Sequence, residues 1–235
     1  DSAADLAPYA TALSDVFGTA LHVSLSDGAS FTLDADAAAE LVPVAGLLGA
    51  VTIDVSDLRA AVAADATGLA SLGGLLGTVT LTDGTATDAA TAADLTPIAT
   101  HLGNGVTISI ADTAAAIADA AATLATLHAE GRLGSVTAVN QSAATVASAG
   151  AALHDLGATA TILDTAADVA AALDALQPLA AAGALPAITL TDGGTPDLTV
   201  ALAQLTTDPD VLGLMAGQFS YVVSDGSAAN AADLG

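Results

Sequence analysis

Short segments in which apolar and polar residues strictly alternate recur along the whole chain. In residues 78–82 valine and leucine alternate with threonine, and in residues 106–110 valine and isoleucine alternate with threonine and serine. A period of two predicts β-strands with one apolar face and one face of Thr and Ser side chains. A parallel strand that is covered on both faces is instead a continuous apolar run. We therefore expect an open sheet with helices mainly on one face.

Between these segments, apolar residues recur every three to four positions, which predicts helices with one buried face. The two clearest stripes are Ile117, Leu124 and Leu127, and Val169, Leu173, Leu176 and Leu179. Asp112 and Asp164 precede the stripes, where an N-cap side chain accepts hydrogen bonds from the first helical turn. Gly131 and Gly183 follow them, where helices commonly end. The predicted helices thus have both start and stop signals.

The predicted strands begin with a recurring motif of the type Leu-Gly-x-Val-Thr. It occurs at residues 48–52, 76–80 and 133–137, and in a variant form at 185–189. The strand ends fall into two interleaved series, each with a spacing of about 55 residues, so the repeating unit is a doublet of two strand–helix halves. The predicted doublets are approximately 1–57, 58–112, 113–164 and 165–225, and residues 226–235 begin a further unit.

The connections in the doublet admit more than one architecture. Asp27-Gly28 and Asp83-Gly84 stand between alternating runs, which is the strongest short-range signal for a hairpin, although a corner of a solenoid is an alternative. The sequence therefore predicts a right-handed α/β solenoid or a ββαβα tandem-repeat array. A (β/α)8 barrel is the main alternative because the chain has the length and the strand–helix pairs for one. The polar strand face argues against a barrel.

The chain is strongly acidic, with 26 Asp and Glu residues against Arg59 and Arg132, and its formal net charge is −24. Binding to nucleic acid or to an anionic membrane surface requires clustered basic residues, so neither is expected. An acidic surface attracts cations. The absence of cysteine excludes disulfides and thiolate metal sites. The uncharged apolar stretches are too short or too interrupted for membrane insertion, and no signal-like segment opens the sequence.

No arrangement of residues typical of an active site is found in the sequence. The four histidines, His22, His101, His128 and His154, occupy unlike positions in different repeats and form no H-E-x-x-H pair. There is no G-x-S-x-G elbow, no phosphate-binding G-x-x-x-x-G-K loop, and no lysine for a Schiff base. We therefore expect a protein that is not an enzyme.

Aspartates at the predicted strand ends form the main candidate site. They are Asp27, Asp57, Asp83, Asp112, Asp164, Asp192 and Asp225. Carboxylates aligned along one sheet edge favour calcium, and the candidate ligands are Asp27, Asp34, Asp36, Asp83 and Asp192. Roles as turn and N-cap residues explain the same positions. The Thr and Ser face is a second candidate, as a surface for polysaccharide, although threonine also simply suits an exposed strand.

Two runs resemble a known group of proteins. Residues 164–177, with the sequence DTAADVAAALDALQ, and residues 188–196, with the sequence ITLTDGGTP, look like the repeats of very large secreted surface proteins of alphaproteobacteria. The resemblance implies type I secretion, a location outside the cell or on its surface, and a role as an adhesin, matrix or surface-layer component. The glycine-rich calcium-binding nonapeptide that often accompanies such repeats is absent from this sequence.

The ends of the sequence suggest how the repeat continues. Residues 1–6 match residues 164–169 almost letter for letter, and residues 226–235 enter the same phase of the repeat. A repeat array without polar caps has sticky ends, so we expect covalent continuation of the repeat or head-to-tail self-association. The predicted function is a non-catalytic, extracellular structural repeat module of a cell-surface, matrix or filament-forming protein. The alternatives are a carbohydrate- or ion-binding adhesin module that recognises a polysaccharide or a host surface, and a barrel enzyme with an acidic active-site rim.

Overall fold

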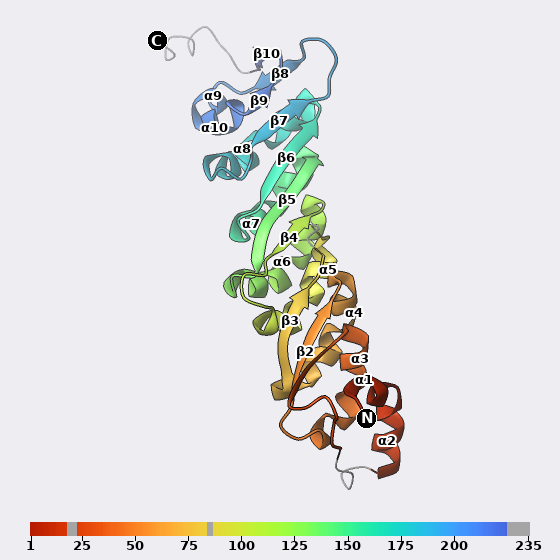
Figure 1. Cartoon of the computed structure of the whole chain (residues 1–235). Helices are drawn as coiled ribbons and strands as arrows, with labels where there is room; N and C mark the ends of the chain where they lie inside the picture. The colour runs from red at the N-terminus through yellow and green to blue at the C-terminus, as the bar shows by residue number, and fades with distance from the viewer. Residues whose placement is uncertain (18–22, 84–86, 225–235) are drawn as a thin grey trace. The chain divides into compact units, whose positions relative to one another are not determined.

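The computed structural model describes residues 1–17, 23–83 and 87–224, which form two compact units (Figure 1). The first unit comprises residues 1–109 and 126–134, and the second comprises residues 110–125 and 135–235. In both units helices alternate with strands, and the strands pair in parallel. The chain is therefore an α/β protein with parallel sheets.

The first unit alternates short and long helices between its strands. Its strands are β1 (Ser30–Leu33), β2 (Thr52–Asp57) and β3 (Leu76–Leu81). Its α-helices are α1 (Ala3–Leu6), α2 (Ala10–Phe17), α3 (Ala35–Glu40), α4 (Arg59–Ser71) and α5 (Ala89–Asp94). Its 3-10 helices are η1 (Ala7–Tyr9), η3 (Val42–Leu47), η4 (Gly73–Leu75) and η5 (Thr96–His101).

Three elements contribute residues to both units. They are β4 (Ile108–Ala111), α6 (Ala114–Ala129) and β5 (Leu133–Gln141). The remaining helices of the second unit are α7 (Ala143–Asp155), α8 (Ala166–Ala181), α9 (Gln204–Thr207) and α10 (Pro209–Leu212). Its remaining strands are β6 (Thr159–Asp164), β7 (Ala187–Leu190), β8 (Asp197–Val200), β9 (Met215–Ala216) and β10 (Ser220–Val223).

In the first sheet and from β4 to β7, strands that follow one another in the chain are neighbours, whereas β9 pairs with β7 and β10 pairs with β8 in a sheet of their own. The first sheet has the order β1-β2-β3, and the second has the order β4-β5-β6-β7-β9. The register places Phe31 beside Ile53 and Ile162 beside Ile188, so apolar side chains of adjacent strands share one face. Figure 1 shows α7 and α8 on the same side of β6 and β7. The sequential parallel order means that each helix returns the chain to the next position in the sheet.

The two faces of the sheet differ as the alternation predicts. On the covered face, Ile53, Val55 and Val79 are almost completely buried. On the other face, Thr80 and its neighbours in β2 and β3 are exposed. The exposed positions of these two strands are Thr52, Ser56, Thr78 and Thr80. The prediction of one apolar face and one open Thr and Ser face is confirmed for this sheet.

The predicted helix stripes are confirmed, but the cap positions shift by one residue. Every member of both stripes is buried in α6 or α8. Thr165, and not Asp164, is the N-cap residue of α8, and its side chain accepts a hydrogen bond from the amide of Asp168. Thr113 has the corresponding role at the start of α6. Gly183 ends α8 in the left-handed conformation with φ of 73°, which glycine adopts without steric cost.

The predicted hairpins at Asp-Gly are wrong where the structure describes both flanks. β7 and β8 flank Asp192-Gly193, yet β7 pairs with β6 and β9, whereas β8 pairs with β10 in a separate sheet. Residues 23–25, which precede Asp27-Gly28, form no strand. Gly84 lies outside the described residues. At Asp192-Gly193 the signal therefore marks a corner, where the chain leaves one parallel sheet at the end of β7 and continues into another at β8.

A bulge in the first sheet places a carboxylate inside the strand pairing. The register between β2 and β3 shifts between Ile53 and Val55. Beside the shift, the Asp54 carboxylate accepts a hydrogen bond of 2.7 Å from the backbone amide of Thr78. A side chain at Gly77 would collide with Asp54 and Thr52. Gly77 thus leaves the space in which Asp54 satisfies the amide that the bulge frees.

Candidate functional site

Several of the aspartates at the strand ends bind the start of a helix from the preceding strand–helix unit. Asp57 ends β2 and accepts a hydrogen bond of 2.7 Å from the amide of Leu58 and one of 3.1 Å from the amide of Ala35, the first residue of α3. Asp164 ends β6 and repeats this arrangement with Thr165 and with Ala143, the first residue of α7. Both oxygens of each carboxylate are therefore engaged.

The same contact recurs along both units. The Asp27 carboxylate accepts from the amide of Ala3 at the start of α1. Asp83 accepts from the amide of Arg59 at the start of α4 over 2.9 Å. Asp192 accepts from the amide of Ala166 at the start of α8 over 2.6 Å. We call these side chains, together with Asp57, Asp164 and Gln141, the cap column.

Gln141 occupies the place in the cap column where the Asp-Gly signal is missing from the sequence. Its Oε1 accepts a hydrogen bond of 3.2 Å from the amide of Ala114, the first residue of α6. Asn140 precedes it with φ of 55°, in the left-handed region that asparagine tolerates better than most residues. The longer Gln side chain and the irregular backbone at Asn140 together maintain the contact in this unit.

The physical reason for the cap column lies at the helix starts. The first amides of a helix have no partner within the helix, and the helix dipole makes this end positive. A carboxylate supplies both an acceptor and a compensating negative charge. Apart from α4, whose N-cap residue Leu58 makes no side-chain cap, the helices in the column have an N-cap side chain of their own as well, for example Thr165 for α8. The column therefore binds a second amide from outside the helix and joins adjacent strand–helix units.

The structure gives four of the five calcium candidates separate capping roles. Asp27, Asp83 and Asp192 belong to the cap column. Asp34 is the N-cap residue of α3 and accepts from the amide of Ala37 over 2.8 Å, and Asp36 is exposed in the first turn of the same helix. Within residues 1–17, 23–83 and 87–224, no group of three or more His, Asp or Glu side chains has a geometry suited to a metal ion.

Asp34 and Asp36 do lie close enough to a further carboxylate to repel it. Partial burial, followed by repulsion from Asp36, Asp57 and Asp34, raises the pKa of Asp65 on the adjacent helix α4. Two of the calcium candidates, Asp34 and Asp36, thus act on the same side chain. The arrangement concentrates negative charge between α3 and α4, where a diffuse cloud of cations would reduce the repulsion.

The histidines lie apart from one another. His101 is half-buried, and its Nδ1 lies 3.1 Å from the carbonyl oxygen of Gly77. His128 and His154 are exposed, and His154 lies 3.4 Å from Asp155 on the same helix. His22 and Asp225, which the sequence also singles out, lie outside the described residues. The described histidines are not brought together at one site.

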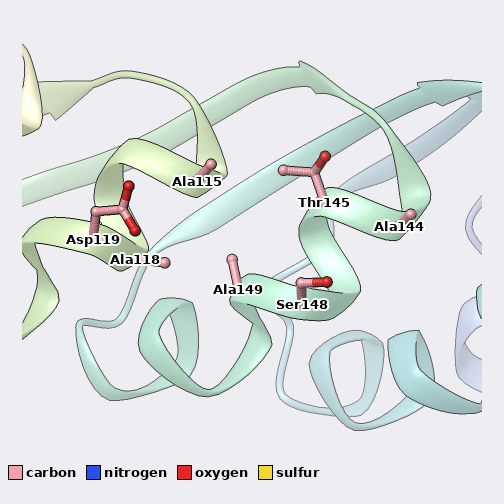
Figure 2. A pocket seen from close by; sticks show the side chains of 7 residues that line it. All are labelled: Ala115, Ala118, Asp119, Ala144, Thr145, Ser148 and Ala149. Atoms are coloured by element: carbon pink, nitrogen blue, oxygen red, sulfur yellow. The ribbon is translucent and has the colours of Figure 1, made fainter.

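A groove of about 420 Å³ runs between α6 and α7 in the second unit. Figure 2 shows its lining, in which Ala118 of α6 and Ala149 of α7 face one another. The other lining residues are Ala115, Asp119, Ala144, Thr145 and Ser148. The groove exists because these side chains are small. It contains a single ionisable side chain, Asp119, so its lining has no pair of groups for general acid–base chemistry.

A polar network joins α8 to α9 and α10. Gln177 donates to Asp210 through Nε2 over 2.7 Å and accepts from the amide of Val211 through Oε1 over 3.0 Å. Gln204 donates to Asp174 over 2.8 Å. The carboxyl groups of Asp174 and Asp208 lie within hydrogen-bonding reach of each other, and each shifts the pKa of the other. Asp208 is 3% exposed, which is rare for aspartate.

Two of these interactions could not be found from the sequence alone. Gln141 has no Asp-Gly signal, and only its position at about the expected repeat spacing points to the cap column. The Asp174–Asp208 pair joins residues far apart in the chain, and nothing in the local pattern indicates that they meet. The strand-end aspartates themselves were found by their regular spacing.

The fold and the cap column define the chain as an α/β protein of parallel strand–helix units that are linked by side-chain caps. Comparison of the chain with protein-family models, curated protein sequences and solved structures gave no match. Among the helices of the described residues, none combines the length and the apolar character needed to cross a membrane.

Proposed function

We propose that this chain is an extracellular structural repeat module of a cell-surface, matrix or filament-forming protein, without catalytic activity. The observation that carries the proposal is the cap column. The polar residues that recur at the strand ends bind helix starts of neighbouring units, so their recurrence is accounted for by stacking. A protein built to extend by stacking has its stability in the contacts between adjacent units.

We further propose that the units form a right-handed α/β solenoid. The sequential order of the parallel strands β1 to β3 and β4 to β7 supports this, as does the exposed face of Thr and Ser. A (β/α)8 barrel would have an interior filled by side chains and an outer face covered by helices, so a polar, exposed strand face fits it poorly. In a barrel enzyme the strand-end carboxylates would also have to remain available to a substrate, whereas Asp57 and Asp164 have both oxygens engaged.

The proposed partner is a second copy of the same repeat, joined head to tail or in one longer chain. The acidic surface and the hydroxyl-rich sheet face also fit the adhesin alternative, in which the exposed Thr and Ser positions contact a polysaccharide. The two roles are compatible, because a repeat array presents its sheet face along its whole length.

Small-angle X-ray scattering of the purified chain tests the architecture. A compact domain of this length has a radius of gyration of about 17–18 Å. We expect a clearly larger value and a pair-distance distribution with a long tail. A value near that of the compact domain would favour the barrel and remove the main support for a structural array.

The extracellular role needs a separate measurement, made in the native host. An antibody against the chain should label intact cells or the surrounding matrix, with a cytoplasmic protein as the control for lysis. Labelling only after the cells are permeabilised would contradict the proposal.

A further inference from the structure

We propose that Asp208 and Asp174 share a single proton and form an acid-closed latch that holds α9 and α10 against α8. The inference concerns a conformational device within the second unit and does not depend on the proposed function. It rests on the arrangement of side chains at this helix junction.

Asp208 stands at the N-cap position of α10, but its side chain does not cap that helix. The amide of Val211, which an N-cap aspartate would ordinarily bind, is occupied by Oε1 of Gln177 from α8. The Asp208 carboxyl group is therefore released from the role that its position predicts. It faces Asp174 on α8 instead.

The Asp208 carboxyl group is enclosed and lacks an ordinary donor. Its Oδ2 is buried, and no hydrogen-bond donor of the described residues reaches it. Two ionised carboxylates cannot form a hydrogen bond, because each only accepts. The contact between Asp208 and Asp174 therefore needs a proton on one of them. Asp208 is the buried partner and holds the proton, while exposed Asp174 accepts it and also accepts from Gln204.

Arginine and lysine are absent from this junction. Arg59 and Arg132 are the only such residues of the chain, and both belong to the first unit. On α7, which packs against α8, the titratable groups are His154 and Asp155, and His154 lies beside Asp155. The other ionisable groups on the elements packed here are Asp168 on α8, Asp210 on α10 and Asp197 at the start of β8, all of them acidic. Helix α9 has no ionisable side chain. Full ionisation of the pair would leave a buried, uncompensated charge.

The two pKa values move in the directions that a shared proton requires. Burial, followed by the hydrogen bond to Asp174 and repulsion from it, raises the pKa of Asp208 above 3.8, while the Thr207 hydroxyl acts weakly in the opposite sense. Hydrogen bonds from Gln204 and Asp208 lower the pKa of Asp174 below 3.8. The raised pKa of Asp208 stabilises the folded state at low pH. This contribution to the free energy of unfolding is lost as the pH rises through that pKa. The contribution of Asp174 is lost when the pH falls through its lowered pKa, so the latch is strongest near 3.8.

The direct test is a titration of the aspartate carboxyl carbons by NMR, combined with amide hydrogen exchange of the intact chain. We expect Asp208 to titrate above 3.8 and Asp174 below it. Protection of the α10 amides relative to those of α7 should fall from about pH 4 to about pH 7, after correction for intrinsic exchange. Each unit of difference between folded and unfolded pKa changes this protection about tenfold.

Two variants separate the latch from a general effect of pH. Asp208→Asn supplies a permanent donor, so protection of α10 should no longer depend on pH. Asp174→Asn gives the ionised Asp208 a donor and should also remove the dependence, which keeps the test valid if one variant fails to fold. Asp197→Asn, an exposed position at the start of β8, should leave the dependence intact.

Three results would overturn the latch. The first is an ordinary or lowered pKa for Asp208, and the second is equal protection of α10 at both pH values. The third is restoration of protection at about pH 7 by millimolar Ca²⁺ or Mg²⁺ but not by Na⁺ at equal ionic strength. That result would mean that a divalent cation, and not a proton, joins the two carboxylates.

Discussion

The Asp164 carboxylate accepts a hydrogen bond of 2.9 Å from the backbone amide of Ala143, which lies 21 residues earlier in the chain. Asp164 ends a strand and Ala143 begins the helix of the preceding unit. The contact thus couples the end of one strand–helix unit to the start of another. Repeated by the other residues of the cap column, it makes the start of each of these helices depend on the strand that follows.

Removing this carboxylate tests the cap column. We expect Asp164→Ala to lower the free energy of unfolding by about 1–3 kcal/mol, because two helix-start amides lose their acceptor. Asp164→Asn keeps one acceptor oxygen and should lose less. Asp119→Ala, at an exposed site within α6, should change stability by less than about 0.5 kcal/mol. Urea denaturation measures all three, and equal losses for Asp119 and Asp164 would show that the caps do not stabilise the fold.

The two faces of the sheet should differ in their sensitivity to substitution. Leu124→Ala and Leu173→Ala remove completely buried side chains and should each cost about 2–5 kcal/mol. Thr80→Ala and Thr107→Ala change exposed positions and should cost far less. The same denaturation experiment compares them. Similar losses on both faces would mean that another layer covers the Thr face in solution.

Gly77 should tolerate no side chain. A methyl group there collides with the Asp54 carboxylate, which is fixed by its hydrogen bond to Thr78, so Gly77→Ala should lower the melting temperature clearly. Gly74→Ala is the matched control, because a methyl group at that position meets no atom within 4 Å. Thermal unfolding followed by circular dichroism compares the variants. An unchanged melting temperature for Gly77→Ala would show that the bulge is not formed as described.

The charge between α3 and α4 should make stability depend on pH. Because burial and neighbouring carboxylates raise the pKa of Asp65 above 3.8, ionisation of this group destabilises the folded state. Asp65→Asn should therefore raise the melting temperature at neutral pH and low salt. The difference should vanish below pH 3.8, where the carboxyl group is neutral in both states. A gain that persisted in acid would point to packing and not to charge.

Divalent cations should stabilise the chain, mainly by screening its charge, with calcium as the likeliest specific ion. If Asp34 and Asp36 contribute to a calcium site, millimolar Ca²⁺ should raise the melting temperature more than Na⁺ at equal ionic strength. The double variant Asp34→Asn and Asp36→Asn should lose the excess. If Ca²⁺ and Na⁺ have equal effects on the original chain, specific calcium binding should be rejected.

Local patterns predicted the parts of the structure that depend on local chemistry. The alternation of Val79 with threonines predicted a strand with one buried face, and the spacing of Leu124 and Leu127 predicted a buried helix face. Both follow from geometric periods of two and of about 3.6 residues. The regular spacing of the strand-end aspartates also located most members of the cap column, although it did not predict that they bind the preceding helix.

Other features depend on which units meet and were not predictable in this way. The hairpin at Asp27-Gly28 was predicted from a turn signal that serves equally well at a corner, and residues 23–25 before it form no strand. Asp164 was assigned to its own helix, whereas its second oxygen binds the helix before it. The contact of Asp208 with Asp174 was not predicted, because the cap that Asp208 would provide comes from Gln177, more than thirty residues away.

The cap column also determines how such a chain can change in length. A duplicated segment that runs from one strand end to the corresponding strand end brings with it one helix start and one carboxylate, so every new donor meets an acceptor. An insertion that breaks this phase leaves an amide without its carboxylate at one junction and a carboxylate without its amide at another. Gene duplication in whole units therefore keeps every cap hydrogen bond at the new junctions. Chains of this kind can change in length by complete units without losing these contacts.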